Sequence, residues 1–325
     1  MRKPFLLLSV LRICTLSANE TESCSPPSCC FECCPEPIPL CCCPPESERI
    51  GARYTMGKGL GYSRAYSSLD LFLSEPFCHN RFVPFLDLRG HIFNNGRYAA
   101  NAGLGFRELN ECRTFMWGLN WFYDYFQSKQ RPFNQVSMGF EFFTDSWSGF
   151  INGYLPVGHK ETPLYQFSYL SLDPDHFLLV GTEKLALKGV DAEAGYRFCD
   201  WHCFNLYVGI GPYFYWGKSA ATENAFYADH KKAFGGRFSA SLTYRNWIAL
   251  EGNATYDSLF KWGGQGVLSV TIPFDFFWVS KDAKGSCCLQ ERLYRPVRMN
   301  EIIVVDRLQK SSRDPNILDP RNPPR

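Results

Sequence analysis

The sequence predicts an all-β protein, a transmembrane antiparallel β-barrel with about 12 strands. Three observations support this prediction. Segments of roughly ten residues alternate apolar and polar side chains between residues 60 and 274. Tryptophan and tyrosine lie in or beside these segments, where a barrel needs amphipathic rings at the lipid headgroups and a soluble sandwich does not. No run of 18 or more apolar residues could cross a bilayer as a helix, so any crossing must use strands.

Length and charge exclude some classes of function. The chain has 325 residues, enough for two ordinary domains or one large barrel. Its formal net charge of +2 is too small to indicate nucleic acid or an acidic partner, and nothing in the sequence calls for a cofactor.

The N-terminal residues resemble a targeting segment. A basic start, an apolar run from Phe5 to Leu11 and small residues near Ala18 predict a signal peptide over residues 1–18, although Arg12 interrupts the pattern. Export places the rest of the chain in an oxidising space.

A cysteine- and proline-rich segment follows, and we assign residues 19–50 to the periplasm. Its proline density excludes helices and sheet ladders. Its thiols favour disulfides; a zinc or copper site is the alternative, but adjacent cysteines without histidine fit no common tetrahedral spacing. The cysteines concerned are Cys24, Cys29, Cys30, Cys33, Cys34, Cys41, Cys42 and Cys43.

The alternating pattern then places eleven strands along the chain. A single-chain bacterial barrel needs an even number, so we expect a twelfth between Pro163 and Lys184, where two candidates compete. The eleven lie at roughly 60–74, 80–93, 97–109, 112–127, 133–144, 147–157, 186–198, 203–217, 233–245, 246–257 and 262–274.

The two faces of each strand differ in character. In WGLNWFYDYF (117–126) one face carries mostly aromatic residues and the other Gly118, Asn120, Phe122 and Asp124. The polar face should line a wet lumen, where glycines leave room for an occupant. The predicted lumen-lining residues are Asn101, Gly103, Gly105, Arg107, Gly118, Asn120, Asp124, Glu141, Asn152, Asp191, Glu193 and Arg237.

Six segments in order carry a family resemblance: NAGLGFR, WGLNWFYDYF, SMGFEFF, GFINGYLP, LKGVDAEAGY and ERLYRPVRMNEIIVVD. Over roughly residues 55–306 the chain resembles the β-domain of inverse autotransporters, the intimin and invasin family. The resemblance implies a barrel of twelve strands in the bacterial outer membrane, in contact with lipid and inserted by the barrel-assembly machinery. It also implies a linker that runs from the last strand up through the lumen and carries a passenger outside.

These implications divide the rest of the chain. The barrel occupies residues 55–290 and the linker 291–306, with the alternative that this basic segment stays in the periplasm. We expect Arg292, Arg295 and Arg298 to meet lumen carboxylates. Residues 307–325 read as a disordered tail, so adhesion, the usual family activity, has no visible carrier. The predicted linker residues are Arg292, Arg295, Pro296, Val297, Arg298 and Asn300.

Sidedness sorts the remaining cysteines. With the tight turn Asn94 to Gly96 placed in the periplasm, Cys78 and Cys112 fall in neighbouring outer loops and can pair. On the same assignment Cys199, Cys203, Cys287 and Cys288 join the periplasmic thiols. CDWHC (199–203) invites a metal interpretation, but a turn disulfide or free thiols fit better. So many periplasmic thiols suggest cross-links to other cysteine-rich envelope proteins.

Three functions from different classes follow. The first is a surface anchor and translocator tied to the envelope through its cysteines. The second is a porin-like channel for small polar solutes, which requires that the linker does not fill the lumen. The third is a barrel-embedded enzyme, which we do not expect because the six histidines accompany no nucleophile motif.

Overall fold

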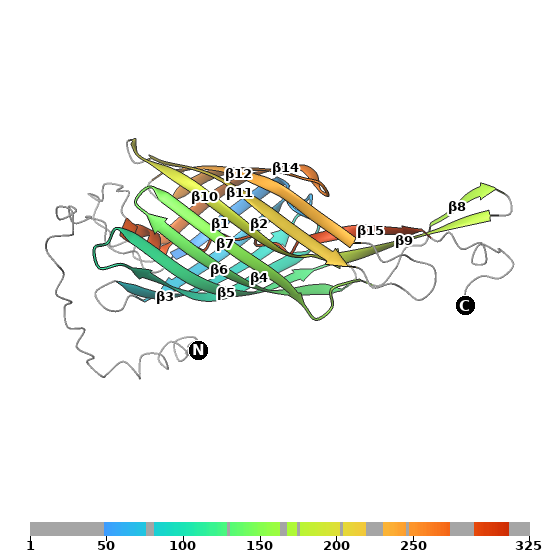
Figure 1. The fold of residues 1–325 in the computed structure, drawn as a ribbon, viewed down its shortest axis with the longest axis horizontal. Coiled ribbons are helices and arrows are strands. Elements are labelled where there is room, and N and C mark those ends of the chain that lie inside the picture. Colours follow the sequence, from blue (N-terminus) through green and yellow to red (C-terminus); the bar gives the residue numbers. More distant parts are fainter. Residues whose placement is uncertain are drawn as a thin grey trace, which may run out of the picture. The chain divides into compact units, whose positions relative to one another are not determined.

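The computed structural model describes residues 49–75, 81–128, 131–162, 168–173, 176–201, 204–218, 230–244, 247–273 and 289–311. Twelve of its strands form a closed barrel in the order β1-β14-β13-β12-β11-β10-β7-β6-β5-β4-β3-β2, with every neighbouring pair antiparallel (Figure 1). The predicted fold class is confirmed. The barrel strands are β1 (Arg49–Lys58), β2 (Tyr66–Ser74), β3 (Phe82–Phe93), β4 (Tyr98–Leu109), β5 (Phe115–Gln127), β6 (Pro132–Thr144), β7 (Trp147–Val157), β10 (Lys188–Trp201), β11 (Phe204–Lys218), β12 (His230–Tyr244), β13 (Ile248–Asp257) and β14 (Lys261–Pro273).

The predicted position of the twelfth strand was wrong. It is β1, which pairs with β14 from Arg49↔Pro273 to Lys58↔Gly264 and closes the ring. The barrel therefore begins at Arg49, inside the segment assigned to the periplasm, and the first predicted strand, 60–74, covers β2 and part of the loop that joins it to β1. β1 does alternate, but its outward face carries a single aromatic residue, Tyr54, beside residues such as Ala52 and Met56. This apolar signal is weaker than that of the aromatic rows on other strands.

The segment expected to hold the twelfth strand forms a separate sheet. Its two competing candidates are both strands, β8 (Ser168–Asp173) and β9 (His176–Ala186), and they pair with each other instead of entering the barrel wall. The third strand of this sheet is β15 (Val305–Ser311), which pairs with β9. Residues 307–311 are thus strand, although we had assigned them to the disordered tail.

Alternation divides the wall into an apolar outside and a mainly polar inside. On β5, Trp121 and Tyr123 are exposed on the outer surface, whereas Asn120 and Asp124 are buried within the barrel. The same division holds on β14, where Leu268, Val270 and Ile272 are exposed outward. No helix in the described residues is long and apolar enough to span a membrane.

Adding β1 reverses the sidedness of the first half of the chain. An even strand number puts Arg49 and Pro273 at one end, together with the short connections 110–114 and 145–146. The long connections 158–187 and 219–229 lie at the other end. Short turns belong to the periplasm and long loops to the outside, so the turn at Asn94 is extracellular and Cys112 is periplasmic, the opposite of our assignment.

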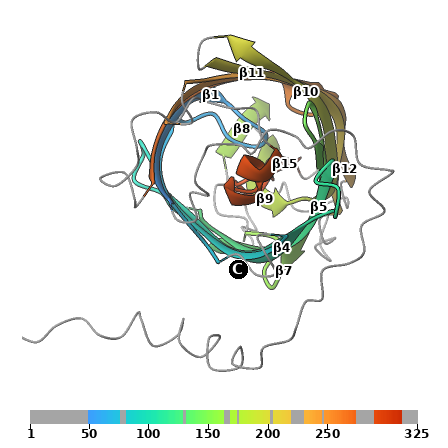
Figure 2. The ribbon, with the colours of Figure 1, turned by 90° about the vertical axis from the view of Figure 1, so that its left-hand side faces the viewer.

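The C-terminal linker lies inside this ring of strands (Figure 2). It begins with η1 (Leu289–Tyr294), a 3-10 helix whose Leu293 and Tyr294 are buried among wall side chains at the periplasmic end, and it reaches the outer end at Ile302 to Val305. We call the two apolar layers the periplasmic collar and the outer collar. The periplasmic collar includes Phe72, Val83, Phe85, Leu109, Met116, Phe143, Phe150 and Tyr207; the outer collar includes Leu60, Tyr66, Phe93, Phe126, Phe133, Tyr154, Leu185, Leu187, Tyr213 and Tyr215.

Candidate functional site: the linker within the lumen

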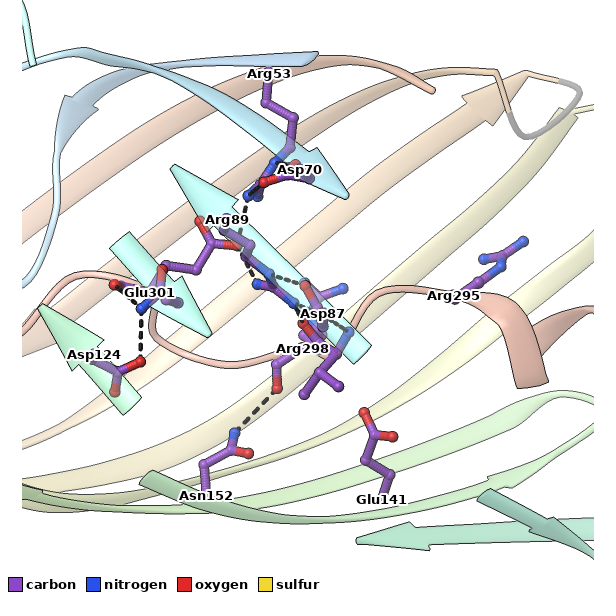
Figure 3. A network of polar contacts seen from close by, with 12 residues as sticks. Arg53, Asp70, Asp87, Arg89, Asp124, Glu141, Asn152, Arg295, Arg298 and Glu301 are labelled. Carbon is purple, nitrogen blue, oxygen red and sulfur yellow. Dashed lines mark hydrogen bonds and ion pairs between the residues drawn. The ribbon is translucent and has the colours of Figure 1, made fainter. Parts of the chain in front are cut away.

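A buried polar layer between the two collars holds the linker by its carboxylate Glu301. Glu301 Oε1 accepts from Arg53 Nη2 at 2.8 Å and forms a second ion pair with Arg89, from neighbouring positions of the wall (Figure 3). Each arginine keeps a wall carboxylate as well, since Arg53 Nη2 donates to Asp70 at 2.8 Å and Arg89 Nε to Asp87 at 2.9 Å. Two wall arginines and two wall carboxylates thus surround one linker carboxylate, and every charge has an opposite partner.

The same pair of wall residues also fixes the linker backbone. The amide of Val297 donates to Asp87 Oδ2 at 3.1 Å, and Arg89 Nη2 donates to the Val297 carbonyl at 2.6 Å. Asp87 and Arg89 are two residues apart on β3, so both side chains point inward. The linker is extended here and has no ladder of its own, so the wall satisfies its buried amide and carbonyl.

Arg107 likewise binds the backbone of the linker, at the periplasmic collar. Its side chain is fully buried, pairs with Glu141 at 2.9 Å, and donates from Nη1 to the carbonyls of Arg292 (3.1 Å) and Leu293 (2.9 Å). Its guanidinium also lies 4.8 Å from the ring centroid of Phe85. These carbonyls end η1, where a short helix lacks partners, so a cation is well placed.

The linker supplies its own cation at Arg298. Arg298 reaches Glu193 at 2.9 Å and Glu251 at 3.2 Å, and its guanidinium lies 4.6 Å from the ring centroid of Tyr207. The Arg298 carbonyl accepts from Asn152 Nδ2 at 3.2 Å. Two residues later the amide of Asn300 donates to the Tyr154 hydroxyl at 2.8 Å, and Tyr154 in turn donates to Asp191 at 2.9 Å.

A row of polar side chains crosses four adjacent strands and ends on the linker. Ser68 Oγ lies 2.8 Å from His91 Nδ1, and His91 Nε2 lies 2.7 Å from Asn101 Oδ1. Because Asn101 Oδ1 can only accept, the neutral ring carries its proton on Nε2 and Ser68 donates to Nδ1. Asn101 Nδ2 donates both to Asp124 at 2.7 Å and to the Glu301 carbonyl at 2.9 Å.

The structure places the predicted lumen residues on the inner face, in several different settings. Asn101, Arg107 and Asn152 contact linker backbone, Glu193 contacts Arg298, and Asp124, Glu141 and Asp191 support those contacts from the wall. Arg237 lies 3.7 Å from Asp191, and Asn120 is buried beside Gly139.

The inward glycines have a different role from the one predicted. A Cβ at Gly103 would first meet the ring of Phe122, and one at Gly105 would meet Phe85 and the Leu119 carbonyl. At Gly118 the nearest atoms belong to Phe106, Arg107 and Glu141. These glycines make room for side chains of the wall itself, and those side chains in turn contact the linker.

The predicted linker arginines behave differently from one another. Arg298 meets carboxylates, as expected. Arg292 instead donates to the backbone carbonyls of Trp147 (2.9 Å) and Asp145 at a periplasmic turn. Arg295 contributes its carbonyl to Arg107, Pro296 is exposed to the lumen, and Val297 is buried in the periplasmic collar.

The central acid of the site, Glu301, was missed, together with its wall partners Arg53, Asp70, Asp87 and Arg89. A signal existed in FVPFLDLRGHIF, where every second residue gives Val83, Phe85, Asp87, Arg89 and His91 on one face. The inner face of this strand begins apolar because it crosses the periplasmic collar, which hides the polar row from a simple inside-polar rule.

Beside the linker a cavity of about 340 Å³ remains, lined mainly by β1 and β11–β14. Arg237, Gln265, Asn253 and Ser269 face it. A cavity of this size with polar side chains in its lining has room for water.

Comparison with known proteins identifies the architecture. The family model of the inverse autotransporter β-domain matches residues 55–245. The chain belongs to this family. As an inverse autotransporter β-domain, it is an outer-membrane β-barrel that acts as an anchor and translocator, in contact with membrane lipid.

One solved structure shares the fold of this inverse autotransporter at low identity, and two others match it with lower scores. A membrane protein from a study of in-meso crystallization is 15% identical with a TM-score of 0.55, over 80% of this chain and 100% of that one. An outer membrane channel from Pseudomonas putida F1 is 11% identical (TM-score 0.43, 72% and 98% covered). The translocator domain of the autotransporter NalP from Neisseria meningitidis is 10% identical (TM-score 0.29, 70% and 88% covered). No curated protein matches the chain.

Most of the disulfide candidates lie outside the described residues: Cys24, Cys29, Cys30, Cys33, Cys34, Cys41, Cys42, Cys43, Cys78, Cys203, Cys287 and Cys288. So does the predicted signal peptide. Cys112 is half-buried in the turn between β4 and β5, and Cys199 belongs to β10. The sidedness derived above puts Cys112 and Cys199 at the periplasmic end of the barrel.

Proposed function

We propose that this inverse autotransporter is a surface anchor whose own linker stays in the lumen as a permanent plug and displays the C-terminal segment outside. The observation that carries the proposal is Glu301, a linker carboxylate that two wall arginines hold inside the barrel. Moving the linker would break both ion pairs and leave Arg53 and Arg89 to be resolvated, which costs free energy. A segment that only passes through the lumen would not need such a contact.

The contacts along the linker favour a plugged lumen rather than an open channel. From Arg292 to Val305 the wall binds linker carbonyls, amides and charged side chains, and apolar collars pack around both ends. Ions avoid a constriction lined by Leu, Ile, Phe and Tyr because they would lose hydration there. The remaining cavity lies beside the linker and extends to Arg49 and Thr271 near the periplasmic end of the wall.

Conductance in planar bilayers tests the plug. The intact protein should show little steady conductance, and removal of residues 291–325 should produce stable openings. Removal of residues 312–325 alone is the matched control, since it keeps the linker and β15, and it should stay closed. Steady conductance from the intact chain would favour the porin-like channel instead, and continued closure after removal of 291–325 would mean that the wall side chains seal the lumen themselves.

We further propose that the cysteine-rich segment ties the anchor to the envelope. The signal-like N-terminus and the periplasmic sidedness of Arg49 support this proposal, because we expect an exported segment with closely spaced thiols to form disulfides in an oxidising space. The partners we expect are other cysteine-rich envelope proteins, and insertion of the barrel itself should depend on the barrel-assembly machinery.

A further inference from the structure

The linker leaves the barrel along one edge of β9, and the other edge of β9 is hydrogen-bonded to the barrel rim. On the opposite edge, the Ala186 amide donates to the Lys160 carbonyl at 2.9 Å and the Thr162 amide to the Lys184 carbonyl at 3.0 Å. Lys184 Nζ also donates to Ser128 Oγ at 3.0 Å, on the connection between β5 and β6. The base of β9 is therefore fixed to the barrel rim on one side, and its other edge faces the emerging chain.

The emerging chain fills that edge from within the barrel mouth outward. The Leu187 amide donates to the Val304 carbonyl at 2.9 Å, and the ladder continues from Val305↔Ala186 to Ser311↔Val180. Its inner end is packed, since Val304, Val305, Leu185, Ala186 and Leu187 are all buried. The pairing thus starts in a buried site and extends outward.

We infer that the base of β9 is a strand-addition site that captures the exported chain and makes its exit one-way. The inference rests on the proposed function, since it concerns the segment that the linker displays. Strand addition gives main-chain hydrogen bonds to any extended segment, and alternate side-chain pockets select which one. Here the selecting pocket is the outer collar, which accepts the aliphatic run Ile302 to Val305.

Close approach at one glycine fits this capture. Gly61 has a φ of +78°, and a Cβ there would lie 2.6 Å from the Val305 nitrogen and 2.8 Å from its oxygen. The loop between β1 and β2 therefore touches the backbone of the exiting strand from the side opposite β9. Residue 305 is held between this loop and β9, and the captured strand cannot slide back without breaking the ladder.

Alternation along β15 provides matched variants. Because Leu187 and Val304 form a hydrogen-bonded pair, the amides of Asp306, Leu308 and Lys310 should donate to β9, and those of Arg307 and Gln309 should point away. Leu308→Pro removes an amide that donates to β9, whereas Gln309→Pro removes an amide that points away from β9. Both variants add a proline to β15, so they differ mainly in whether a hydrogen bond between β15 and β9 is lost.

Hydrogen exchange at single-residue resolution, on the purified full-length protein in lipid, gives the first test. The amides of residues 306 and 310 should exchange at least about tenfold more slowly than those of 307 and 309. Leu308→Pro should abolish this difference, and Gln309→Pro should largely keep it. Equal, fast exchange along residues 305–311 of the parent protein would overturn the capture site.

A C-terminal epitope tag tests the one-way exit in cells. The fraction of molecules with an antibody-accessible tag should fall severalfold for Leu308→Pro and stay near the parent value for Gln309→Pro, while heat-dependent gel mobility shows that both barrels are folded. Equal display by both variants would overturn the latch. A tag that is inaccessible in the parent would instead reject the proposed surface display. If Leu308→Pro fails to fold, the exchange pattern of the parent decides the inference alone.

Discussion

At the scale of single residues, the decisive group is Glu301. It is the acid that joins two wall arginines, yet each arginine retains a second carboxylate, Asp70 or Asp87. Losing Glu301 therefore weakens the pairing without leaving either cation isolated. The relevant magnitude is that of hydrogen bonds to charged groups, ~1.5 to 3 kcal/mol, and not the larger cost of an orphaned buried charge.

We predict that Glu301→Gln lowers the stability of the plugged barrel by ~1.5 to 3 kcal/mol, because the amide keeps the shape and loses the charge. The measurement is the temperature at which the folded gel mobility is lost. Pro296→Ala, at a linker position exposed to the lumen, is the control and should leave that temperature nearly unchanged. Identical transitions for both variants would show that the ion pairs do not hold the linker.

At the scale of elements, the two faces of a strand should respond oppositely to one substitution. Leu268 on β14 is 49% exposed on the outer surface, whereas its neighbour Ser269 lines the lumen cavity. Leu268→Arg should destabilise the barrel by ~2 to 4 kcal/mol if it lies near the bilayer midplane, and Ser269→Arg should cost far less because its side chain enters water. Urea unfolding in lipid vesicles measures both. Equal losses would mean that the outer surface does not face lipid.

Glycines on the same wall are not interchangeable, and their roles can be separated. A Cβ at Gly211 on β11 would overlap the Ala192 carbonyl across an irregular stretch of the β10–β11 pairing, whereas one at Gly252 on β13 meets nothing within 4 Å. Gly211→Ala should cost ~1 to 3 kcal/mol or more as backbone shifts, and Gly252→Ala should be nearly neutral. Folding yields in detergent would show the contrast; a stable Gly211→Ala protein would contradict it.

Strand by strand, the sequence predicts the faces better than the connectivity. The period of two is local, so Asn101, Asp124 and Glu141 could be assigned to one face from their neighbours alone. Which strand closes the ring is not local, and β1 was lost beside a cysteine-rich segment that dominates the composition. The β8 and β9 residues carry ordinary strand signals, and only tertiary pairing decides that they leave the wall.

The linker site shows the same limit. Arg298 was predicted because cations near lumen carboxylates suggest pairing, and Glu301 was missed because a single acid in a basic linker has no pattern. Its partners Arg53 and Arg89 are more than 200 residues away in the chain. Such a pairing depends on the register of the threaded segment, which no spacing in the sequence encodes.

At the scale of the whole molecule, the thiols assigned to the periplasm should make the anchor part of a covalent network. Cysteines from Cys24 to Cys43 are too crowded for all of them to pair internally, since a bridge requires Cα atoms ~4.4 to 6.8 Å apart with suitable directions. We predict disulfide-linked complexes on non-reducing gels of thiol-blocked envelopes. Replacing the eight cysteines by serine should remove the complexes and leave the heat-dependent mobility of the barrel intact. A monomer from the unmodified protein would reject the network, and stoichiometric bound metal would point to the metal site.

The pairing of β1 with β14 also sets the timing of assembly. β1 pairs with β2 on one edge and finds its partner on the other edge only in β14, so the ring stays open until Pro273 has been synthesised and placed. The linker begins at Leu289, after only 15 intervening residues. Both collars then pack against an extended chain. Closure of the barrel wall and export of the C-terminal segment therefore follow one another closely in assembly. A delay in closure prolongs the time during which the C-terminal segment can leave.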